Sequence, residues 1–315
     1  MAQSTSLWQR ACDSLRYRIC DGWRRLHPRR LPGNRHARVL LPLDYPPSRA
    51  AVSRWGTNQP PIPALVTLFG AGAQAQARML DGLRRFSPDL ARIGRRYTRR
   101  GAAVPGWLGG AMTPIDAALL YVFLRDYRPA TYLEIGSGVS TSFARRAITD
   151  GGLATRIVSI DPAPRAAIND ICDEIVRDGL ETVDLTVFDR LLPGDIVFLD
   201  GSHRSFMNSD VTVFMIDVLP RLKPGVIVHI HDIFLPDDYP DSFKTWYWNE
   251  QYLVATYLMG HRHRIEVLMP SHYISGQTGF AAILAAPPVD LGPRNDGWRQ
   301  GGSLWFTHTA PFDPA

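Results

Sequence analysis

Two short stretches near the middle of the chain place carboxylates and imidazoles where they could act together in catalysis. Asp200 and His203 follow one apolar segment, and His231 and Asp232 follow the next. If these segments are neighbouring parallel strands, the four side chains converge at the carboxyl edge of the sheet, where open α/β sheets bind their ligands. Asp200, His231 and Asp232 could then hold a divalent cation such as Mg²⁺, which would acidify a substrate hydroxyl.

The same four residues allow two other interpretations. His203 or His231 could serve as the general base without a metal, because an imidazole exchanges protons near neutral pH. Alternatively, all four are hydrogen-bonded polar groups that only end their strands. We expect catalytic roles for His203, His231 and Asp200, and the metal site, the metal-free base and the structural role stay open.

A glycine turn upstream could bind a ligand through its backbone. The apolar run Thr131–Ile135 predicts a buried strand, which ends at Gly136 and Gly138 before a predicted helix. A strand, a glycine turn and a helix N-terminus together leave backbone N–H groups open to a ligand. Ser137 lies within this turn, and Ser140 or Thr141 is placed to cap the helix.

Glu134 and Thr141 separate this turn from a dinucleotide site. A dinucleotide fingerprint has a third glycine where this chain has Thr141. A carboxylate just before the first glycine would repel a pyrophosphate, but it suits a ligand with a cationic amino group. S-adenosylmethionine has such a group beside a carboxylate that N–H donors can hold. A plain turn without a ligand is the alternative.

Asp161 ends the second predicted strand, 25 residues after Gly136. A carboxylate at this place can accept hydrogen bonds from both ribose hydroxyls of an adenosine. NAD sites use the same arrangement, so Asp161 indicates a nucleoside without identifying it. A surface Asp before a turn proline is the structural alternative.

The elements that must position these residues form an alternating pattern of strands and helices. This pattern predicts an α/β fold with a doubly wound, mostly parallel sheet. Expected strands are 131–135, 156–160, 183–188, 195–199, 226–230, 264–268 and 303–306. Expected helices are 64–97 (split at Pro88), 115–127, 142–149, 163–177, 209–222, 249–259 and 279–285.

Four sequences together resemble the small-molecule branch of the class I S-adenosylmethionine-dependent methyltransferases, near the macrocin and sugar O-methyltransferase group. They are Glu134–Gly138, Ile160-Asp161, Leu199–His203 and Leu222–Gly225, and the resemblance covers Pro114 to Trp305. It implies a seven-stranded Rossmann-like sheet closed by an antiparallel hairpin. It also implies methyl transfer to a small-molecule acceptor, most readily at a hydroxyl oxygen.

The resemblance implies roles for individual residues as well. Asp189, after the third expected strand, falls where such enzymes contact adenine. Those enzymes bind Mg²⁺ through an Asp after strand four and an Asp-Asp pair after strand five, and this chain has His231-Asp232 in place of the pair. The implied cofactor-binding residues are Glu134, Gly136, Ser137, Gly138, Ser140, Asp161 and Asp189.

The chain divides by charge into two parts. Residues 1–110 hold 19 Arg and Lys against 5 Asp and Glu, whereas residues 111–315 hold 16 against 25. We expect 1–110 to be a basic, mostly helical extension with a proline-rich linker, and 111–310 to be the methyltransferase domain. Because the basic excess lies outside the candidate catalytic region, no nucleic-acid partner is expected. An amphipathic helix over 7–26 could bind a membrane surface, or dock on the domain or a partner subunit.

Two further expectations concern surroundings and substrate access. The chain has no run of about 18 apolar residues and only three scattered cysteines, which favours a cytoplasmic protein. The aromatic segment Leu235–Trp248 follows the active edge and is predicted to be a lid or substrate wall, with Tyr239 and Trp246 as its best candidates for contact. An NAD-linked oxidoreductase and a non-catalytic scaffold protein are the alternatives.

Overall fold

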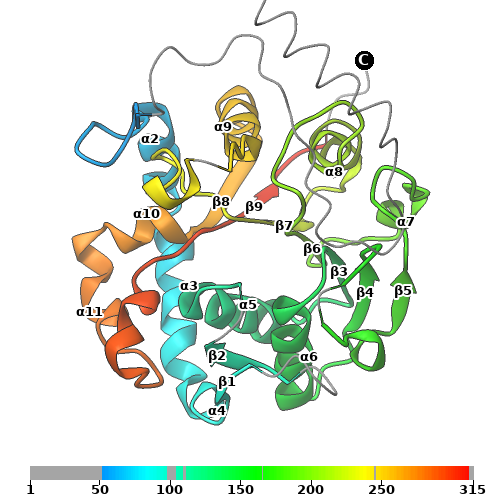
Figure 1. The fold of residues 1–315 in the computed structure, drawn as a ribbon, viewed down its shortest axis with the longest axis horizontal. Coiled ribbons are helices and arrows are strands. Elements are labelled where there is room, and N and C mark those ends of the chain that lie inside the picture. Colours follow the sequence, from blue (N-terminus) through cyan, green and yellow to red (C-terminus); the bar gives the residue numbers. More distant parts are fainter. Residues whose placement is uncertain (1–51, 98–103, 109–110, 165, 245, 312–315) are drawn as a thin grey trace, which may run out of the picture. The chain divides into compact units, whose positions relative to one another are not determined.

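The apolar runs form a twisted sheet with helices on both faces in a computed structural model of the chain (Figure 1). The structure describes residues 52–97, 104–108, 111–164, 166–244 and 246–311. The helix predicted over 7–26, and the linker as far as residue 51, lie outside these residues.

Seven strands make up the main sheet within the described residues, in the order β5-β4-β3-β6-β7-β9-β8. The strands from β3 to β7 are parallel, and β9 runs antiparallel to both β7 and β8. The predicted fold class, including the closing hairpin, is confirmed. The strands are β3 (Thr131–Ile135), β4 (Arg156–Ile160), β5 (Glu174–Val176), β6 (Ile196–Leu199), β7 (Ile227–His231), β8 (Ile265–Pro270) and β9 (Ser303–His308).

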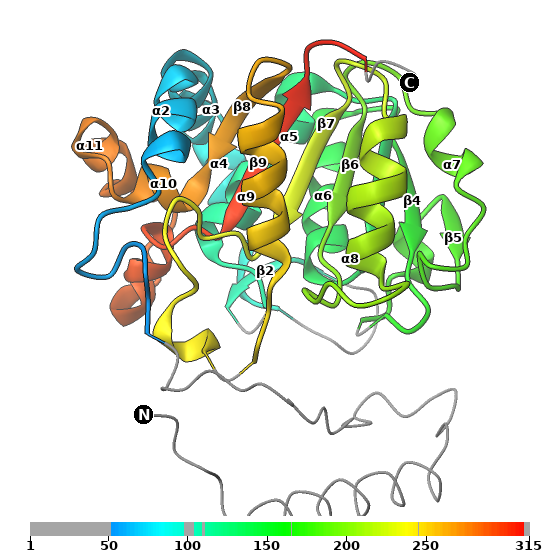
Figure 2. The same ribbon diagram turned by 90° about the horizontal axis from the view of Figure 1, so that it is seen from above.

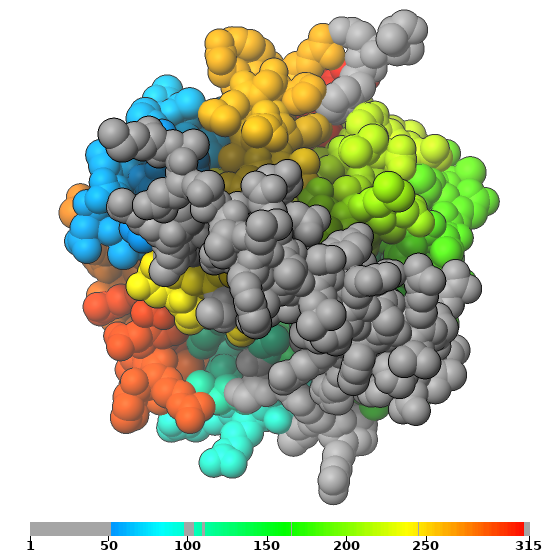
Figure 3. Space-filling view, turned by 45° about the horizontal axis from the view of Figure 1, so that its top comes forward, coloured from blue at the N-terminus to red at the C-terminus, as the bar shows by residue number. Residues whose placement is uncertain are grey.

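Two groups of helices cover the two faces of this sheet (Figures 1 and 2). One face carries α2 (Pro63–Ala71), α8 (Asp210–Val213) and α9 (Glu250–Gly260), and Figure 3 shows α9 lying between α2 and the segment around α8. The other face carries α3 (Ala73–Arg85), α5 (Pro114–Tyr127) and α6 (Val139–Gly151). Further α-helices are α4 (Ser87–Leu90), α7 (Thr186–Asp189), α10 (Ser271–Ser275) and α11 (Ala281–Leu284). The strands β1 (Gly94–Arg96) and β2 (Gly106–Leu108) form a small parallel pair.

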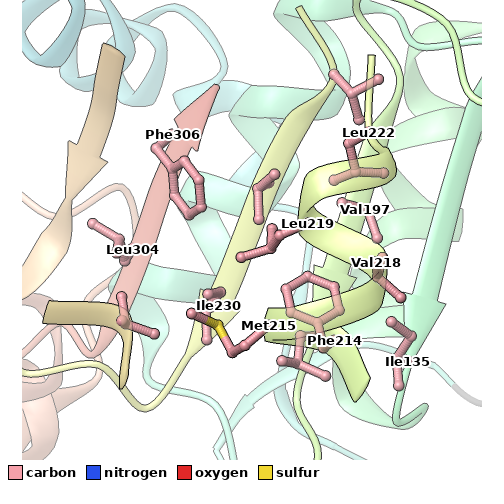
Figure 4. Packing of buried hydrophobic residues seen from close by; sticks show 14 of the residues in the cluster. Ile135, Val197, Phe214, Met215, Val218, Leu219, Leu222, Ile230, Leu304 and Phe306 are labelled. Carbon is pink, nitrogen blue, oxygen red and sulfur yellow. The ribbon is translucent and has the colours of Figure 1, made fainter. Parts of the chain in front are cut away.

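The core on the α8 side shows how the sheet is held. A π-helical turn, Phe214–Val218, continues α8 and packs its apolar side chains onto the strands (Figure 4). Phe214 and Val218 are fully buried against a cluster that contains Val197 and Ile230. Burying such side chains contributes roughly 1.5–3 kcal/mol each, so this packing fixes β6 and β7 side by side.

Helix α5 begins and ends at the signals that the sequence contains. Thr113 accepts a hydrogen bond from the backbone N of Asp116 at 3.4 Å, and Pro114 occupies the first turn. The helix ends at Tyr127 and is followed by Arg128, whose φ of 49° is left-handed. It is buried along most of its length, in keeping with its nearly all-apolar sequence.

Two predicted elements between β4 and β6 are wrong. Instead of a helix over 163–177, the chain forms a short 3-10 turn and then the edge strand β5, because Asp173 pairs with the backbone of Ile157 beside β4. Instead of a strand over 183–188, it forms α7, because Asp184 Oδ1 accepts from the N–H of Thr186 and turns the chain into a helix.

The described part of residues 1–110 packs onto the sheet. Leu65 and Phe69 of α2 are buried in the same cluster as Leu133, and α3 joins the cluster on the opposite face. Ser53 to Ala315 forms one compact unit. Of the helices in the described ranges, none has the length and apolar content needed to cross a bilayer.

Candidate active site

The turn after β3 and the turn after β6 press against each other at the carboxyl edge of the sheet. The backbone N of Asp200 donates to the carbonyl oxygen of Ile135 at 2.9 Å. Gly136 has a φ of +82°, and a Cβ there would lie 1.9 Å from the carbonyl oxygen of Asp200. Only glycine fits this position. The close approach and the hydrogen bond hold the predicted cofactor turn at Gly136 next to the predicted catalytic residue Asp200.

Asp161 lies beside the same turn. Its Oδ2 accepts a hydrogen bond from the backbone N of Ser137 at 2.8 Å, and its Oδ1 accepts from that of Ala163 at 2.7 Å. The Ser137 and Ser159 hydroxyls are 2.7 Å apart. The carboxylate after β4 and the turn after β3 therefore lie against each other and form one corner of the site.

Gly138 leaves this corner open. Apart from its two chain neighbours, no atom of the described residues lies within 4 Å of the place where its Cβ would stand, and α6 begins at the next residue. The N–H groups at the start of α6 are thus close to free space, as a ligand carboxylate requires. Ser140 lies in the first turn of α6 and is buried. This corner fits the cofactor that the sequence implies.

Glu134 is fully enclosed beneath the turn. It accepts hydrogen bonds from the Tyr132 hydroxyl at 2.9 Å and from the Thr141 hydroxyl, which in turn accepts from the backbone N of Gly138 at 2.9 Å. Burial raises the pKa of Glu134 to about 7, although hydrogen bonds from Ser140 and Thr141 oppose the rise. Thr141, at the place of the missing third glycine, thus links Glu134 to the turn.

Asp189 does not lie where the sequence predicted it. It belongs to α7, and its carboxylate pairs with Arg221 at 3.2 Å while its carbonyl oxygen accepts from Lys223 Nζ at 2.8 Å. Arg221 and Lys223 precede β7, so Asp189 lies toward the amino edge of the sheet. The adenine contact predicted for it is wrong, because no strand ends at residue 188.

Asp200, His231 and Asp232 come together as the sequence predicted. One ligand atom from each residue lies within 4.8 Å of the other two. His231 Nδ1 is 3.5 Å from Asp232 Oδ2 and 3.9 Å from Asp200 Oδ1. Asp232 has a φ of +56°, a conformation that is uncommon for a residue other than glycine and is concentrated at functional sites.

The donor set of this cluster fits a divalent cation. Neither ring nitrogen of buried His231 has a hydrogen-bond partner in the described part of the chain, although Nδ1 lies 3.5 Å from Asp232 Oδ2. The ring could therefore bind a cation that displaces its proton. Burial disfavours its charged form, but Asp232 and Asp200 raise the pKa of His231 to about 10. Burial disfavours charge on Asp200 too, yet His231 and His203 lower the pKa of Asp200 to about 2. Two carboxylates and an imidazole are ligands that such cations accept.

His203 lies between this cluster and a carboxylate that the sequence analysis missed. Its Nε2 is 3.3 Å from Asp200 Oδ1 and 3.5 Å from Asp232 Oδ2, and its Nδ1 is 2.9 Å from Oε2 of Glu250. Burial works against the charged ring, but Asp200 and Glu250 raise the pKa of His203 to about 10. In the sequence, Glu250 looks like an ordinary acidic residue in the first turn of a helix, and nothing near it indicates a contact with His203.

His229 shares a face of β7 with His231, as predicted. Its ring stacks on Phe198 with centroids 3.9 Å apart and lies 5.9 Å from the ring of His231. Burial lowers the pKa of His229 well below its ordinary value. It is therefore a neutral core residue behind the cluster.

The aromatic segment after β7 lies beside His203. The Trp248 and His203 ring centroids are 4.0 Å apart, and Trp246 and Phe243 pack onto Trp248. Of the two favoured candidates for substrate contact, Trp246 is 46% exposed whereas Tyr239 is 7% exposed. Trp246 is thus the more accessible of the two.

The comparisons with known proteins agree with this geometry. A family model described as a methyltransferase domain matches residues 133–233. The match runs from β3 to just past β7, so it includes the glycine turn, Asp161 and the acidic cluster. No curated protein matches the chain significantly.

Several solved structures are distantly similar to this chain. PaMTH1, a methyltransferase of Podospora anserina with bound SAH, is 20% identical and covers 49% of this chain and 73% of its own, with a TM-score of 0.36. TomG, an O-methyltransferase of Streptomyces achromogenes in complex with SAM, is 20% identical and covers 62% and 81%, with a TM-score of 0.35. A putative methyltransferase of Thermobifida fusca is 13% identical and covers 75% and 96%, with a TM-score of 0.35.

Similarities this low add nothing to the assignment, which depends on the matched domain and on the geometry of the chain itself. The strand order, the glycine turn at the end of β3 and the carboxylate after β4 all lie where this kind of domain requires them. The chain therefore contains a methyltransferase domain, and its sheet has the fold of the class I S-adenosylmethionine-dependent methyltransferases.

Proposed function

We propose that this enzyme transfers the methyl group of S-adenosylmethionine to a hydroxyl oxygen of a small-molecule acceptor, with the assistance of a divalent cation. The observation that carries the proposal is the convergence of Asp200, His203, His231 and Asp232 directly beside the glycine turn. A proton-removing cluster next to the cofactor corner suits an acceptor that must lose a proton as it is methylated.

The cofactor supplies an electrophilic methyl group on a sulfonium, and the chain supplies its orientation. We assign the methionine end to the turn of Gly136, Ser137 and Gly138 and to the start of α6 at Ser140. Glu134 supports that turn from below through Thr141. Asp161 accepts the ribose hydroxyls, because each of its oxygens keeps a lone pair beyond its single backbone hydrogen bond.

Asp200, His231 and Asp232 would hold the cation, which would lower the pKa of the acceptor hydroxyl. His203 faces the same carboxylates through Nε2 and takes the proton from the acceptor. Trp246 forms the exposed part of the acceptor wall. An acceptor that is an alcohol needs more activation than a phenol, so the cation contributes most for a sugar-like substrate.

Calorimetric titration with S-adenosylhomocysteine and with NAD, each with and without Mg²⁺, tests the cofactor assignment. We expect binding of S-adenosylhomocysteine and no response to NAD, because Thr141 replaces the third glycine of a dinucleotide site. NAD binding without S-adenosylhomocysteine binding would favour an oxidoreductase. Cofactor binding without transfer to any acceptor would favour a scaffold protein.

A further inference from the structure

Glu250 is a buried carboxylate directed at the ring of His203 rather than at the cation cluster. We propose that Glu250 is the positioning residue of the reaction: it holds the Nδ1–H of His203, so that Nε2 faces the acceptor hydroxyl beside Asp200 and Asp232. This inference rests on the proposed function, because it assigns His203 the proton of the acceptor.

The main chain of His203 is fixed by the start of α9. Its carbonyl oxygen accepts hydrogen bonds from the backbone N of Asn249 at 3.1 Å and of Glu250 at 3.4 Å. Asn249 Oδ1 also accepts from the backbone N of Ser205 at 2.7 Å. These contacts hold His203 at a φ of +60°, a conformation that costs about 1–3 kcal/mol in a residue with a side chain. The loop after β6 is therefore shaped by a helix that begins 47 residues after His203.

The side chain of His203 is restricted from two further directions. Glu250 Oε2 lies 2.9 Å from Nδ1, and both side chains are almost completely buried. The indole of Trp248 lies against the imidazole with ring centroids 4.0 Å apart. A ring held by a carboxylate on one edge and an aromatic face beside it has little freedom to rotate.

Glu250 has one clear partner. Its Oε2 meets His203, whereas its Oε1 is buried without a hydrogen-bond partner among the described residues. A buried carboxylate is costly unless it is paired, so the contact with His203 accounts for its place in the fold. Its position in the first turn of an 11-residue helix adds a small favourable interaction with the helix dipole.

This contact sets the tautomer that the chemistry needs. A cation held by Asp200 and Asp232 would neutralise the carboxylates that face Nε2 at 3.3 and 3.5 Å, and would so favour the neutral ring. Because Nδ1 donates its proton to Glu250, the lone pair of that neutral ring is on Nε2. A carboxylate orients a catalytic imidazole in the same way in hydrolases. As the acceptor oxygen forms its bond to the methyl carbon, the carbon–sulfur bond breaks. The sulfur leaves as a neutral thioether, and the hydroxyl proton moves to Nε2.

The kinetic test uses Glu250→Gln and Glu250→Ala in the full chain, alone and combined with His203→Ala. Glu250→Gln should lower kcat by roughly 10²-fold, with an unchanged KM for S-adenosylmethionine. In the His203→Ala background, the Glu250 substitution should change kcat no further, because its effect acts through that ring. Equal losses in both backgrounds, or an unchanged kcat in Glu250→Gln, would overturn the proposal.

Tyr252→Phe is the matched control for helix stability. It removes a 3.0 Å hydrogen bond from the same first turns of α9 to Asp238 and does not touch His203. We expect wild-type kcat in this variant. A loss equal to that of Glu250→Gln would show that both act only by anchoring the helix, and would contradict the proposal.

A second readout needs no acceptor. An imidazole N–H held by a buried carboxylate should give a far-downfield proton resonance in NMR spectra, identified by its loss in His203→Ala. It should move upfield in Glu250→Gln, whose amide is a weaker acceptor. Absence of the resonance, or no movement in Glu250→Gln, overturns the positioning role. A normal resonance without methyl transfer to any acceptor overturns the proposed function instead.

Discussion

Gly136 and Asp200 are in direct contact at the carboxyl edge of the sheet: a Cβ on Gly136 would lie 1.9 Å from the carbonyl oxygen of Asp200. One residue belongs to the cofactor turn, and the other belongs to the acidic cluster. The contact makes the position of the methyl donor depend on the position of the groups that activate the acceptor. Substitutions at the two glycines of the turn should separate this packing role from ligand binding.

Gly136→Ala should destabilise the fold and the site together. The new Cβ clashes with backbone and the residue keeps a φ of +82°, so we expect a loss of about 2 kcal/mol or more in the free energy of unfolding. Urea denaturation and titration with S-adenosylhomocysteine measure the two effects. Gly138→Ala is the control, because its Cβ meets open space: its stability should be normal while its affinity for S-adenosylhomocysteine falls. Wild-type behaviour of Gly136→Ala would contradict the account.

Asp161→Asn should weaken cofactor binding without unfolding the protein. The amide loses part of its capacity to accept the ribose hydroxyls and the N–H of Ser137, so the Kd for S-adenosylhomocysteine should rise on the order of 10- to 100-fold. Asp189→Asn is the matched control, because Asp189 pairs with Arg221 away from this corner. Equal losses of affinity in the two variants would refute the assignment of the ribose to Asp161.

Glu134 should make stability depend on pH. Burial raises its pKa from 4.5 to about 7, so between these values the folded protein keeps a proton that the unfolded chain has released. Its contribution to stability is therefore fully present below pH 4.5 and is lost as the pH rises through 7. Glu134→Gln removes this dependence. As the pH rises from 4.5 to 7, the wild type should therefore lose roughly 3 kcal/mol of its free energy of unfolding relative to the variant.

Urea denaturation at a series of pH values measures this difference. Glu266→Gln serves as the comparison, because it makes the same chemical change at a carboxylate that lies exposed on β8. Parallel profiles for wild type and Glu134→Gln would show that Glu134 does not hold a proton in the folded state.

Trp246→Ala should weaken binding of the acceptor without destabilising the fold. The indole is 46% exposed and packs edge-on to Phe243, so its loss should change the free energy of unfolding by no more than about 1 kcal/mol. Steady-state kinetics should show a raised KM for the acceptor and an unchanged KM for S-adenosylmethionine. Ile216→Ala, at an exposed residue of the π-helical turn after α8, should change neither KM. An unchanged acceptor KM in Trp246→Ala would remove this residue from the substrate wall.

The sequence predicted the elements whose limits have local chemical causes. Thr131–Ile135 and Arg156–Ile160 form strands with the expected bounds, because each is a mostly apolar run that ends at Gly136 or at Asp161-Pro162. The convergence of Asp200 with His231 followed from the same argument, since neighbouring parallel strands end at one edge.

The errors arose where tertiary pairing overrides local pattern. The alternation of Val183 to Phe188 is typical of a strand, but the Asx turn at Asp184 starts a helix there instead. The position next to β4 in the sheet is occupied by β5, because Asp173 pairs with the backbone beside β4. The sequence did not predict a role for Glu250, because its partner His203 lies 47 positions away and no local motif contains both residues. Residues related only by packing are not visible in a single sequence.

The most direct test of the account is the transfer of a labelled methyl group from S-adenosylmethionine to hydroxyl acceptors, after removal of divalent cations and after their return. We predict an O-methylated product whose formation falls on chelation and recovers with Mg²⁺ in the wild type, but does not recover in Asp232→Asn, whose carboxylate belongs to the cluster with Asp200 and His231. Transfer that continues unchanged after chelation, or no transfer to any hydroxyl acceptor in either condition, would contradict it.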